Sequence, residues 1–496
     1  MSSTSFWLFL TFAAFVVKLL LQQKELPHPP SPPTSPILGV ARTHPKTEYW
    51  KTYAEWGRRY AFDLLGKRSA IYSDRPFPMM AGVLMKREKS MFYISYNERF
   101  KMYRTLFHQS FNPKAAETYW PLLEREAISV ILKIIETPQD LFAHLRGTAA
   151  VVTMKIAYGY QVTGNDDYFV TKAEESMRVA SLAGAPGKWL VDSLPILRFL
   201  PEWFPGAGFK LQAKKWYNQM YTQYLEPVQY VKEQLKSGTA TSSFTSRLLQ
   251  PENGLAADDK LEDIIVWTAG AIYAAATDTT VSAMKTFFAA MMLYPDIQKQ
   301  AQAEIDSFMD QEGRLPTIGD RHRLPFLEAV FKELLRWHPP SPLALFHCTS
   351  RDDMYKGFLI PAKTTVIANI WAMMHDEDVY PHPERFDPLR FIPAPGQEPQ
   401  KNPLDVVFGF GRRICAGQEI GEATVIAQMM MALALLDISK PVDEITGQVI
   451  EQEIEFTTAI VRNSVHFFSH PQLFKVQINR RSSQAFELMN NRLILD

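Results

Sequence analysis

Cysteine is scarce in this chain, with two among 496 residues. So few thiols exclude a disulfide-stabilised fold and a zinc site built from four cysteines. A net charge is also missing, because 53 Lys and Arg balance 53 Asp and Glu, whereas a nucleic-acid-binding protein is expected to be basic. No Asn-x-Ser/Thr sequence occurs, so nothing indicates a glycosylated secreted protein.

One long apolar run stands at the N-terminus. Phe6–Leu21 is apolar except for Thr11 and Lys18, and as a helix it would extend roughly 24 Å, slightly less than the hydrocarbon core of a bilayer. No small-residue cleavage site follows, so we expect a retained membrane anchor over residues 1–26. An amphipathic or buried first helix is the alternative. Lys and Arg on the C-terminal side of the run predict that the rest of the chain is cytoplasmic.

A proline-rich segment separates this anchor from the rest of the chain. Leu26–Pro36 has the sequence LPHPPSPPTSP, which is too rich in proline to form a helix and favours an extended spacer. We therefore expect a hinge at residues 27–36. No repeat or second linker follows, so residues 37–496 are expected to form one domain.

Helical periodicity dominates this domain. Apolar residues recur at three- and four-residue spacing in the segments Glu98–Phe111, Pro121–Glu136, Leu141–Tyr158, Asp166–Leu182, Phe209–Ser237 and Asp296–Gln311. Strand patterns are short and few, as at Thr365–Ile370. The sequence therefore predicts a mainly α fold with a small β part.

The longest predicted helix is Asp258–Tyr294. Four acidic residues in its first turns suit the helix dipole, and Pro295 ends it. Its apolar middle resembles a membrane span, but the polar stretch Thr277–Thr280 interrupts it. We expect this helix to cross the core of a globular domain.

The sharpest local pattern is Phe408–Gly417, which reads FGFGRRICAG. A lone cysteine is more often a small buried residue than a ligand, but the glycines around Cys415 let the backbone approach a flat group closely. The apolar run Glu419–Leu436 has helical length, so Cys415 precedes a helix N-terminus, where the dipole favours a thiolate. Arg412 and Arg413 add positive charge, which suits an anionic cofactor such as haem with its two propionates.

With this loop the sequence resembles the cytochrome P450 family of haem-thiolate monooxygenases, and three further motifs occur in the family's order. Glu333-Leu-Leu-Arg336 matches the Glu-x-x-Arg helix, Pro383-Glu-Arg-Phe386 the Pro-Glu-Arg-Phe turn, and Ala275-Ala-Thr-Asp-Thr-Thr280 the oxygen groove. The likeness is strongest to fungal microsomal members that oxidise secondary metabolites. It implies the P450 fold, with haem between the long central helix and the cysteine loop.

The resemblance assigns roles to residues around the haem. Cys415 would be the axial ligand of the iron, in a loop that also includes Phe408, Gly411 and Gly417. Thr279 would hold dioxygen and its water by hydrogen bonds, and Asp278 would relay protons from solvent; otherwise both are polar residues tolerated in a helix.

Three cations are expected to bind the propionates. Arg413 is the first candidate. Arg104 is the second, although Phe100 stands where the family usually has a Trp that donates a hydrogen bond. His347 is the third, with an exposed loop histidine as the alternative.

A buried network is expected to shape the cysteine loop. Glu333 and Arg336 lie one helical turn apart, and with Arg385 they would form a Glu-Arg-Arg network. The alternative is an exposed ion pair of small energy.

The implied reaction is the insertion of one oxygen atom of O₂ into a lipophilic small molecule. This substrate is expected to contact four apolar segments, Ala81–Tyr96, Met177–Phe209, Pro342–Phe346 and Phe456–Ile460. Its cofactor would be haem b, and NADPH would act only indirectly, because no G-x-G-x-x-G follows a strand. Electrons would come from an NADPH-dependent flavoprotein reductase or cytochrome b5, at the endoplasmic reticulum membrane. Nucleic acid is not expected as a partner.

Two alternatives to this function stay open, one of which rests on a departure from the family. Family members usually have a two-stranded hairpin before the segment Ser73-Asp-Arg-Pro76, and this chain has no room for it after Tyr60. A disabled family member is therefore one alternative. A haem-thiolate isomerase or dehydratase is the other, although Asp278 and Thr279 favour oxygen chemistry.

Overall fold

The computed structural model describes Lys51 and residues 61–164, 166–185, 187–250, 258–396, 398–443, 445–456 and 469–495. The expected anchor at residues 1–26 and the hinge at 27–36 lie outside the described residues, as does most of the segment before residue 61. The boundary between anchor and domain therefore stays a prediction.

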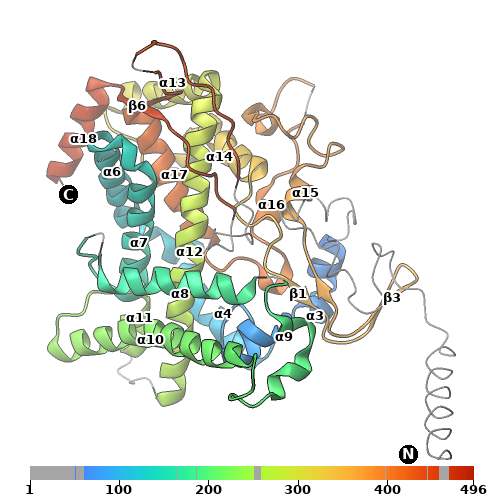
Figure 1. Ribbon diagram of the computed structural model, residues 1–496. Coiled ribbons are helices and arrows are strands. Elements are labelled where there is room, and N and C mark those ends of the chain that lie inside the picture. Colours follow the sequence, from blue (N-terminus) through green and yellow to red (C-terminus); the bar gives the residue numbers. More distant parts are fainter. Residues whose placement is uncertain are drawn as a thin grey trace, which may run out of the picture.

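Helix α12 (Asp259–Leu293) runs through the middle of the molecule (Figure 1). The Asp258 side chain caps it by accepting a hydrogen bond from the Leu261 N–H, and Pro295 opens the next helix. Although α12 is long and apolar enough to span a membrane, most of its apolar surface is buried inside the protein. The prediction of a core-crossing helix is confirmed.

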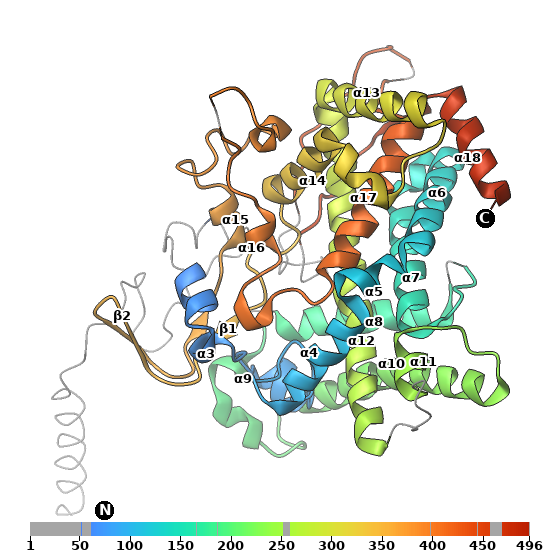
Figure 2. The same ribbon diagram turned by 180° about the vertical axis from the view of Figure 1, so that it is seen from behind.

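Three long helices pack against α12, and a fourth packs against two of these. Helix α7 (Leu141–Tyr158) lies along α12, and α17 (Gln418–Leu435) lies in front of it in Figure 2, while α6 (Trp120–Glu136) packs against both α7 and α17. Helix α10 (Gly208–Ser237) crosses α12 closely, because a side chain at Gly270 would lie 2.4 Å from the Tyr224 ring. Only glycine allows this approach.

The remaining helical elements cover this centre. They are α4 (Glu98–Phe111), α5 (Pro113–Glu117), α8 (Tyr168–Gly184), α9 (Leu190–Ser193), α11 (Phe244–Leu249), α13 (Pro295–Glu312), α14 (Pro325–Trp337), α15 (Ile370–Met374), α16 (Leu404–Val407) and α18 (Ser483–Leu495). Shorter turns are η1 (Phe62–Lys67), α3 (Ser69–Tyr72), η2 (Met79–Leu84), η3 (Pro138–Asp140), η4 (Pro195–Phe199), η5 (Ile318–Arg323), η6 (Pro388–Phe391) and η7 (Gly411–Arg413). Each of the six helices predicted from periodicity is present, because each buries one apolar face in the main core.

The β part consists of three antiparallel pairs within the described residues. Strand β1 (His347–Cys348) pairs with β4 (Thr365–Val366), β2 (Asp353–Tyr355) with β3 (Phe358–Ile360), and β5 (Leu436–Ser439) with β6 (Gln477–Arg480). The predicted strand Thr365–Ile370 is therefore too long: it ends at Val366, and α15 begins at Ile370.

The segment before Ser73 explains why β4 is short. Residues 61–72 form the helical turns η1 and α3, and only Asp74 bridges to the sheet, opposite Cys348. Among the described residues β4 has β1 as its single partner, which agrees with the expectation that a hairpin is missing. A two-residue ladder needs further support, and here Cys348 N–H donates to Asp74 O at 2.8 Å.

Candidate functional site

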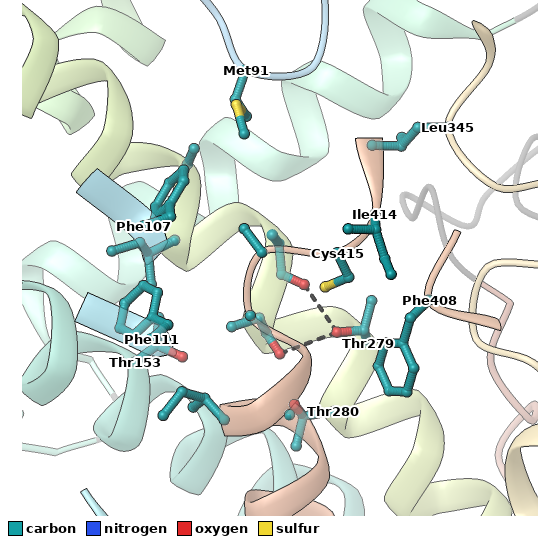
Figure 3. Close-up of a pocket in the computed structure, with 18 of the residues that line it drawn as sticks. Met91, Phe107, Phe111, Thr153, Thr279, Thr280, Leu345, Phe408, Ile414 and Cys415 are labelled. Atoms are coloured by element: carbon teal, nitrogen blue, oxygen red, sulfur yellow. Dashed lines mark hydrogen bonds between the residues drawn. The ribbon is translucent and has the colours of Figure 1, made fainter. Parts of the chain in front are cut away.

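A cavity of about 250 Å³ lies between the cysteine loop and α12. Its wall is mostly apolar and comes from α4, α7, α12, α17 and the cysteine loop. Figure 3 shows Cys415 and Phe408 on the loop and Thr279 on α12 directed into this cavity, with Phe107 and Phe111 of α4 across from them. The predicted meeting of loop and long helix is thus present.

The cysteine loop has a conformation that its glycines permit. Gly409 has φ +85° and Gly411 has φ +54°, in the left-handed region that favours glycine. A side chain at Gly411 would also lie 2.4 Å from the carbonyl oxygen of Leu65. Gly411 therefore serves the packing of the loop against η1, whereas Phe408 and Gly417 line the cavity themselves.

Cys415 is held at the start of α17. Its N–H donates to the Phe408 carbonyl at 2.8 Å, and Cys415 is exposed where it lines the cavity. Burial raises the pKa of the Cys415 thiol; the N–H of Gly417 and the charge of Arg104 oppose that rise. A thiolate here has one hydrogen-bond donor and one nearby cation to stabilise it.

Three arginines line the same cavity. Arg413 donates to Ser73 O at 2.8 Å and Ile94 O at 2.6 Å, Arg104 donates to Ile414 O at 2.7 Å, and Arg75 donates to Phe346 O at 2.7 Å. Burial lowers the pKa of Arg413 to about 10 and also lowers the pKa values of Arg104 and Arg75.

Two of these arginines keep buried nitrogen atoms without a hydrogen bond. They are Nη1 of Arg413 and Nε of Arg75. Buried N–H donors that lack an acceptor are costly, and an anionic group in the cavity would satisfy them. Arg75 was not predicted from sequence; the signal available was its place in the segment Ser73–Pro76, beside the missing hairpin.

Phe100 occupies the position where a hydrogen-bond-donating Trp was expected. The Arg413 guanidinium lies over its ring, 3.7 Å from the centroid. Phe100 therefore fixes Arg413 by a cation–π contact and offers no donor of its own to a propionate.

His347 lies apart from the three arginines' cavity. It belongs to β1, where its Nδ1 is 2.7 Å from Tyr72 O, and it is buried. Burial and the charge of Arg75 lower its pKa to about 3, so it is neutral. His347 is absent from the described residues that line the cavity. A contact between His347 and a propionate stays a prediction, whereas Arg75, which was not predicted from sequence, lines the cavity together with Arg413 and Arg104.

The two groove residues of α12 face different spaces. Thr279 lines the Cys415 cavity and donates to Ala275 O at 2.9 Å (Figure 3). Asp278 is buried and lines a second cavity, and its Oδ1 accepts from Arg146 Nη2 at 3.1 Å. Arg146 also bonds Glu174, so Asp278 is joined to a chain of charged groups.

The second cavity has a volume of about 530 Å³. Phe92 and Leu345 line both cavities, so the two adjoin. Half of its lining residues come from three of the segments expected to contact a substrate, namely 81–96, 177–209 and 342–346. The fourth such segment, Phe456–Ile460, lies outside the described residues after Phe456.

A buried ion-pair network lies behind the cysteine loop. Glu333 and Arg336 of α14 are fully buried, with oxygen-to-nitrogen distances of 2.7 and 2.8 Å. This excludes the alternative of an exposed pair. Arg336 also donates to Met374 O at 2.9 Å.

The third member of this network differs from the prediction. Arg385 is exposed and contributes only its carbonyl oxygen, at 3.2 Å from Arg336 Nη2. Arg390 is buried instead, with Nε 3.4 Å from Glu333 Oε1. The assignment of Arg385 is wrong because Pro383–Phe386 has a close copy, Pro388–Phe391, and only the second copy directs its arginine inward.

These residues fit a haem group. Cys415 supplies a sulfur that opens onto a largely apolar cavity, and Arg413 and Arg75 supply buried donors that still lack acceptors. A flat apolar macrocycle with two carboxylates would satisfy both features at once.

Comparison with known proteins agrees with this fit. Residues 57–449 match the family model described as Cytochrome P450. Cytochrome P450 monooxygenase 208 of Postia placenta is 38% identical over 95% of this chain and 94% of its own length. Cytochrome P450 monooxygenase claR of Ampulloclitocybe clavipes is 38% identical over 94% of this chain and 89% of its own.

A solved structure shows the same fold. A zebrafish cytochrome P450 determined with abiraterone superposes with a TM-score of 0.65 at 21% identity, over 85% of this chain and 92% of that one. The family model, the two fungal relatives and this superposition agree with the cavity geometry, and the chain belongs to the cytochrome P450 family of haem-dependent monooxygenases.

Proposed function

We propose that this protein is a microsomal monooxygenase that hydroxylates a lipophilic small molecule. The reaction is R–H + O₂ + two electrons + two protons giving R–OH + water. The observation that carries the proposal is that Cys415, Thr279 and the unsatisfied arginine donors meet in one cavity, which adjoins a larger apolar one. The named fungal relatives are monooxygenases, so the isomerase or dehydratase alternative is not favoured.

In this proposal the cofactor is haem b. Cys415 ligates its iron, Arg413, Arg75 and Arg104 hold its propionates, and Phe408 and Gly417 lie against it. When bound, a thiolate-ligated haem supplies the reductive activation of dioxygen.

The groove residues of α12 handle protons and water. The Thr279 hydroxyl donates its proton to Ala275 O at 2.9 Å. Its oxygen atom therefore still has lone pairs, which can accept a hydrogen bond from a water molecule that delivers a proton. Asp278 lies next to it in sequence, and Arg146, which also pairs with Glu174, holds the Asp278 carboxylate in place. Protons would pass from solvent along this chain to the Thr279 hydroxyl.

Electrons would arrive from an NADPH-dependent flavoprotein reductase, with cytochrome b5 as a second donor. A basic area suited to such an acidic partner lies close to the cysteine loop. Its exposed cation is Arg412, which lies over the Tyr96 ring at 4.5 Å. Lys101 also approaches Tyr96, although Glu98 neutralises part of its charge.

We place the protein at the endoplasmic reticulum membrane through the apolar residues 1–26. A second membrane contact is the segment around α9 and η4, where large apolar side chains are exposed. They are Leu190, Leu194, Ile196, Phe199, Trp203 and Phe204. Exposed apolar clusters of this kind indicate an interaction surface.

The carbon-monoxide difference spectrum of the reduced protein tests the proposed function. We expect the red-shifted Soret band of thiolate-ligated haem, and Cys415→Ala should abolish it. Cys348→Ala is the matched control, because that thiol lies in β1 away from the cavity. A spectrum typical of histidine-ligated haem in the wild-type protein would contradict the assignment.

A further inference from the structure

Arg87 differs from the other buried arginines. Among the described residues, the buried arginines Arg75, Arg336, Arg390 and Arg413 each donate to a carbonyl or carboxylate oxygen. Arg87 is 3% exposed, and its Nε and Nη1 have no hydrogen-bond partner. It forms no ion pair with the described residues. A guanidinium stays charged at any physiological pH, so this buried charge has no compensating anion within the part of the chain that the structure describes.

The surroundings of Arg87 hold it in place without neutralising it. Its guanidinium lies 4.7 Å from the centroid of the Tyr93 ring. The backbone N–H of Arg87 donates to Gly82 O at 2.9 Å, and its backbone carbonyl accepts from the Ser90 N–H at 3.0 Å. On the side of α10, Arg87 also forms a side-chain hydrogen bond with Tyr224, a neutral group; its charge and this bond oppose the rise that burial causes in the pKa of Tyr224. Burying an unpaired cation costs several kcal/mol, which makes a purely structural role expensive.

Arg87 lines the larger, 530 Å³ cavity. Two more polar residues of that wall are buried there, Ser176 on α8 and Gln223 on α10, and Ser176 Oγ has no partner. The cavity thus contains unsatisfied donors on a cation and on a hydroxyl. Groups of this kind bind an anionic oxygen.

The acidic residues of the same wall are already engaged. Asp278 pairs with Arg146, and Asp192 Oδ1 accepts from Met80 N–H at 2.8 Å. Neither forms a salt bridge with Arg87 in the described part of the chain. The rest of the wall is mainly apolar, with Phe92, Leu345 and their neighbours leading toward the Cys415 cavity.

We propose that the substrate is a lipophilic carboxylic acid whose carboxylate binds Arg87 and Ser176. This inference rests on the proposed monooxygenase function and names the substrate class for the same site. The apolar body of the acid fills the cavity toward Phe92 and Leu345. Oxygen is then inserted into a C–H bond remote from the carboxylate, which is left unchanged.

Ligand binding to the haem-loaded full-length protein tests this at pH 7.5, where a carboxylic acid is ionised. The probes are dodecanoic acid and 6-phenylhexanoic acid, each beside its methyl ester, measured by calorimetry and by the haem difference spectrum. We expect at least one acid to bind about tenfold or more tightly than its ester, as one charge-assisted hydrogen bond would give.

Substitutions of single residues show which side chains cause the preference for the acid over its ester. Arg87→Met should remove it while leaving ester binding within about twofold, and Arg87→Lys should keep part of it because the charge remains. Ser176→Ala should reduce it by a smaller factor. Arg178→Met is the matched control. Arg178 lies on α8, the helix that carries Ser176, where it is exposed and pairs with Glu175.

Three results would overturn the proposal. They are equal binding of acid and ester, no binding of either acid, and a preference that survives in Arg87→Met. Each of these results counts only if the same sample shows the carbon-monoxide band of thiolate-ligated haem. Loss of that band in the wild-type protein would instead contradict the proposed function, so the two failures are distinguishable.

Discussion

Two regions near the Cys415 cavity differ in how their buried charges are satisfied. In the first, the closed side, Glu333 bonds to Arg336 and to Arg390, and both arginines also donate to carbonyl oxygens of the loop that follows α14. In the second, the open side, Arg87 and Ser176 border the larger cavity and are buried with polar atoms that lack partners. We expect the closed network to hold the cysteine loop in shape, and we propose that a ligand completes the hydrogen bonds on the open side.

Breaking the closed side should have the largest effect. Arg390→Met leaves the buried Glu333 carboxylate with one cation fewer and several carbonyls without a donor. We expect a loss of about 3–5 kcal/mol of stability and little haem incorporation. Urea unfolding and the carbon-monoxide band of the purified variant measure both.

Arg385→Met is the matched control for Arg390→Met. Its side chain is exposed, and the carbonyl that Arg336 uses is unaffected by the substitution. We expect a change of less than about 0.5 kcal/mol. If Arg385→Met were the more damaging variant, the identification of Arg390 as the third member would be wrong.

A second prediction concerns proton delivery at the boundary of the two sides. Thr279→Ala should keep haem and stability but direct reducing equivalents from NADPH to hydrogen peroxide, because the hydroxyl that positions the proton source is lost. We expect peroxide per NADPH to rise several-fold. Thr286→Ala is the control, since it removes a similar hydrogen bond to a carbonyl four residues earlier on α12, to Ser282 O at 2.9 Å. Unchanged peroxide in Thr279→Ala would contradict the role.

Much of the closed side could be predicted from sequence. Short motifs fix Cys415, Glu333 and Arg336, because a ligand and an ion pair need particular residues at particular spacing. Arg385 was assigned in place of Arg390 because PERF and PLRF are near copies, and only the fold decides which arginine enters the core. Arg75 was missed, since its role depends on a chain reversal that brings residue 75 beside the cysteine loop.

The open side could be predicted less well. The segments that line the substrate cavity were identified as apolar, but the buried state of Arg87 was not foreseen. Within MKREKS a lone arginine looks like any exposed cation. Its burial follows from α8 and α10 packing over η2 and the following loop, and sequence periodicity says nothing about that contact.

The closed side also predicts sensitivity to acid. Burial lowers the pKa of His347 to about 3 and that of His375 to about 4. Below pH 6.5 the unfolded chain binds protons at these histidines and the folded protein does not, so stability falls as the pH falls toward about 4. Each contributes up to about 2 kcal/mol between pH 6.5 and 5.

Urea unfolding of the His347→Gln variant at pH 7.5 and pH 5 measures how much of the loss of stability at low pH is due to His347. The substitution should reduce the difference between the two pH values. His322→Gln is the control, because His322 is exposed and lies within the surface turn η5. A pH dependence unchanged in His347→Gln would mean that other groups cause the acid sensitivity.

The smallest effect on the fold is expected at the exposed apolar segment beside the open side. Phe199 is 71% exposed and Trp203 is 80% exposed, so replacing both by Ser should change stability by less than about 0.5 kcal/mol and leave the carbon-monoxide band intact. Binding to lipid vesicles should nevertheless fall in a protein that lacks residues 1–26, because those side chains would no longer enter the bilayer surface. Vesicle flotation measures this, with exposed Leu473 replaced by Ser as the control on another part of the surface. Equal flotation of the two variants would contradict a membrane role for the segment, and failure of the truncated protein to bind haem would place the first 26 residues within the core.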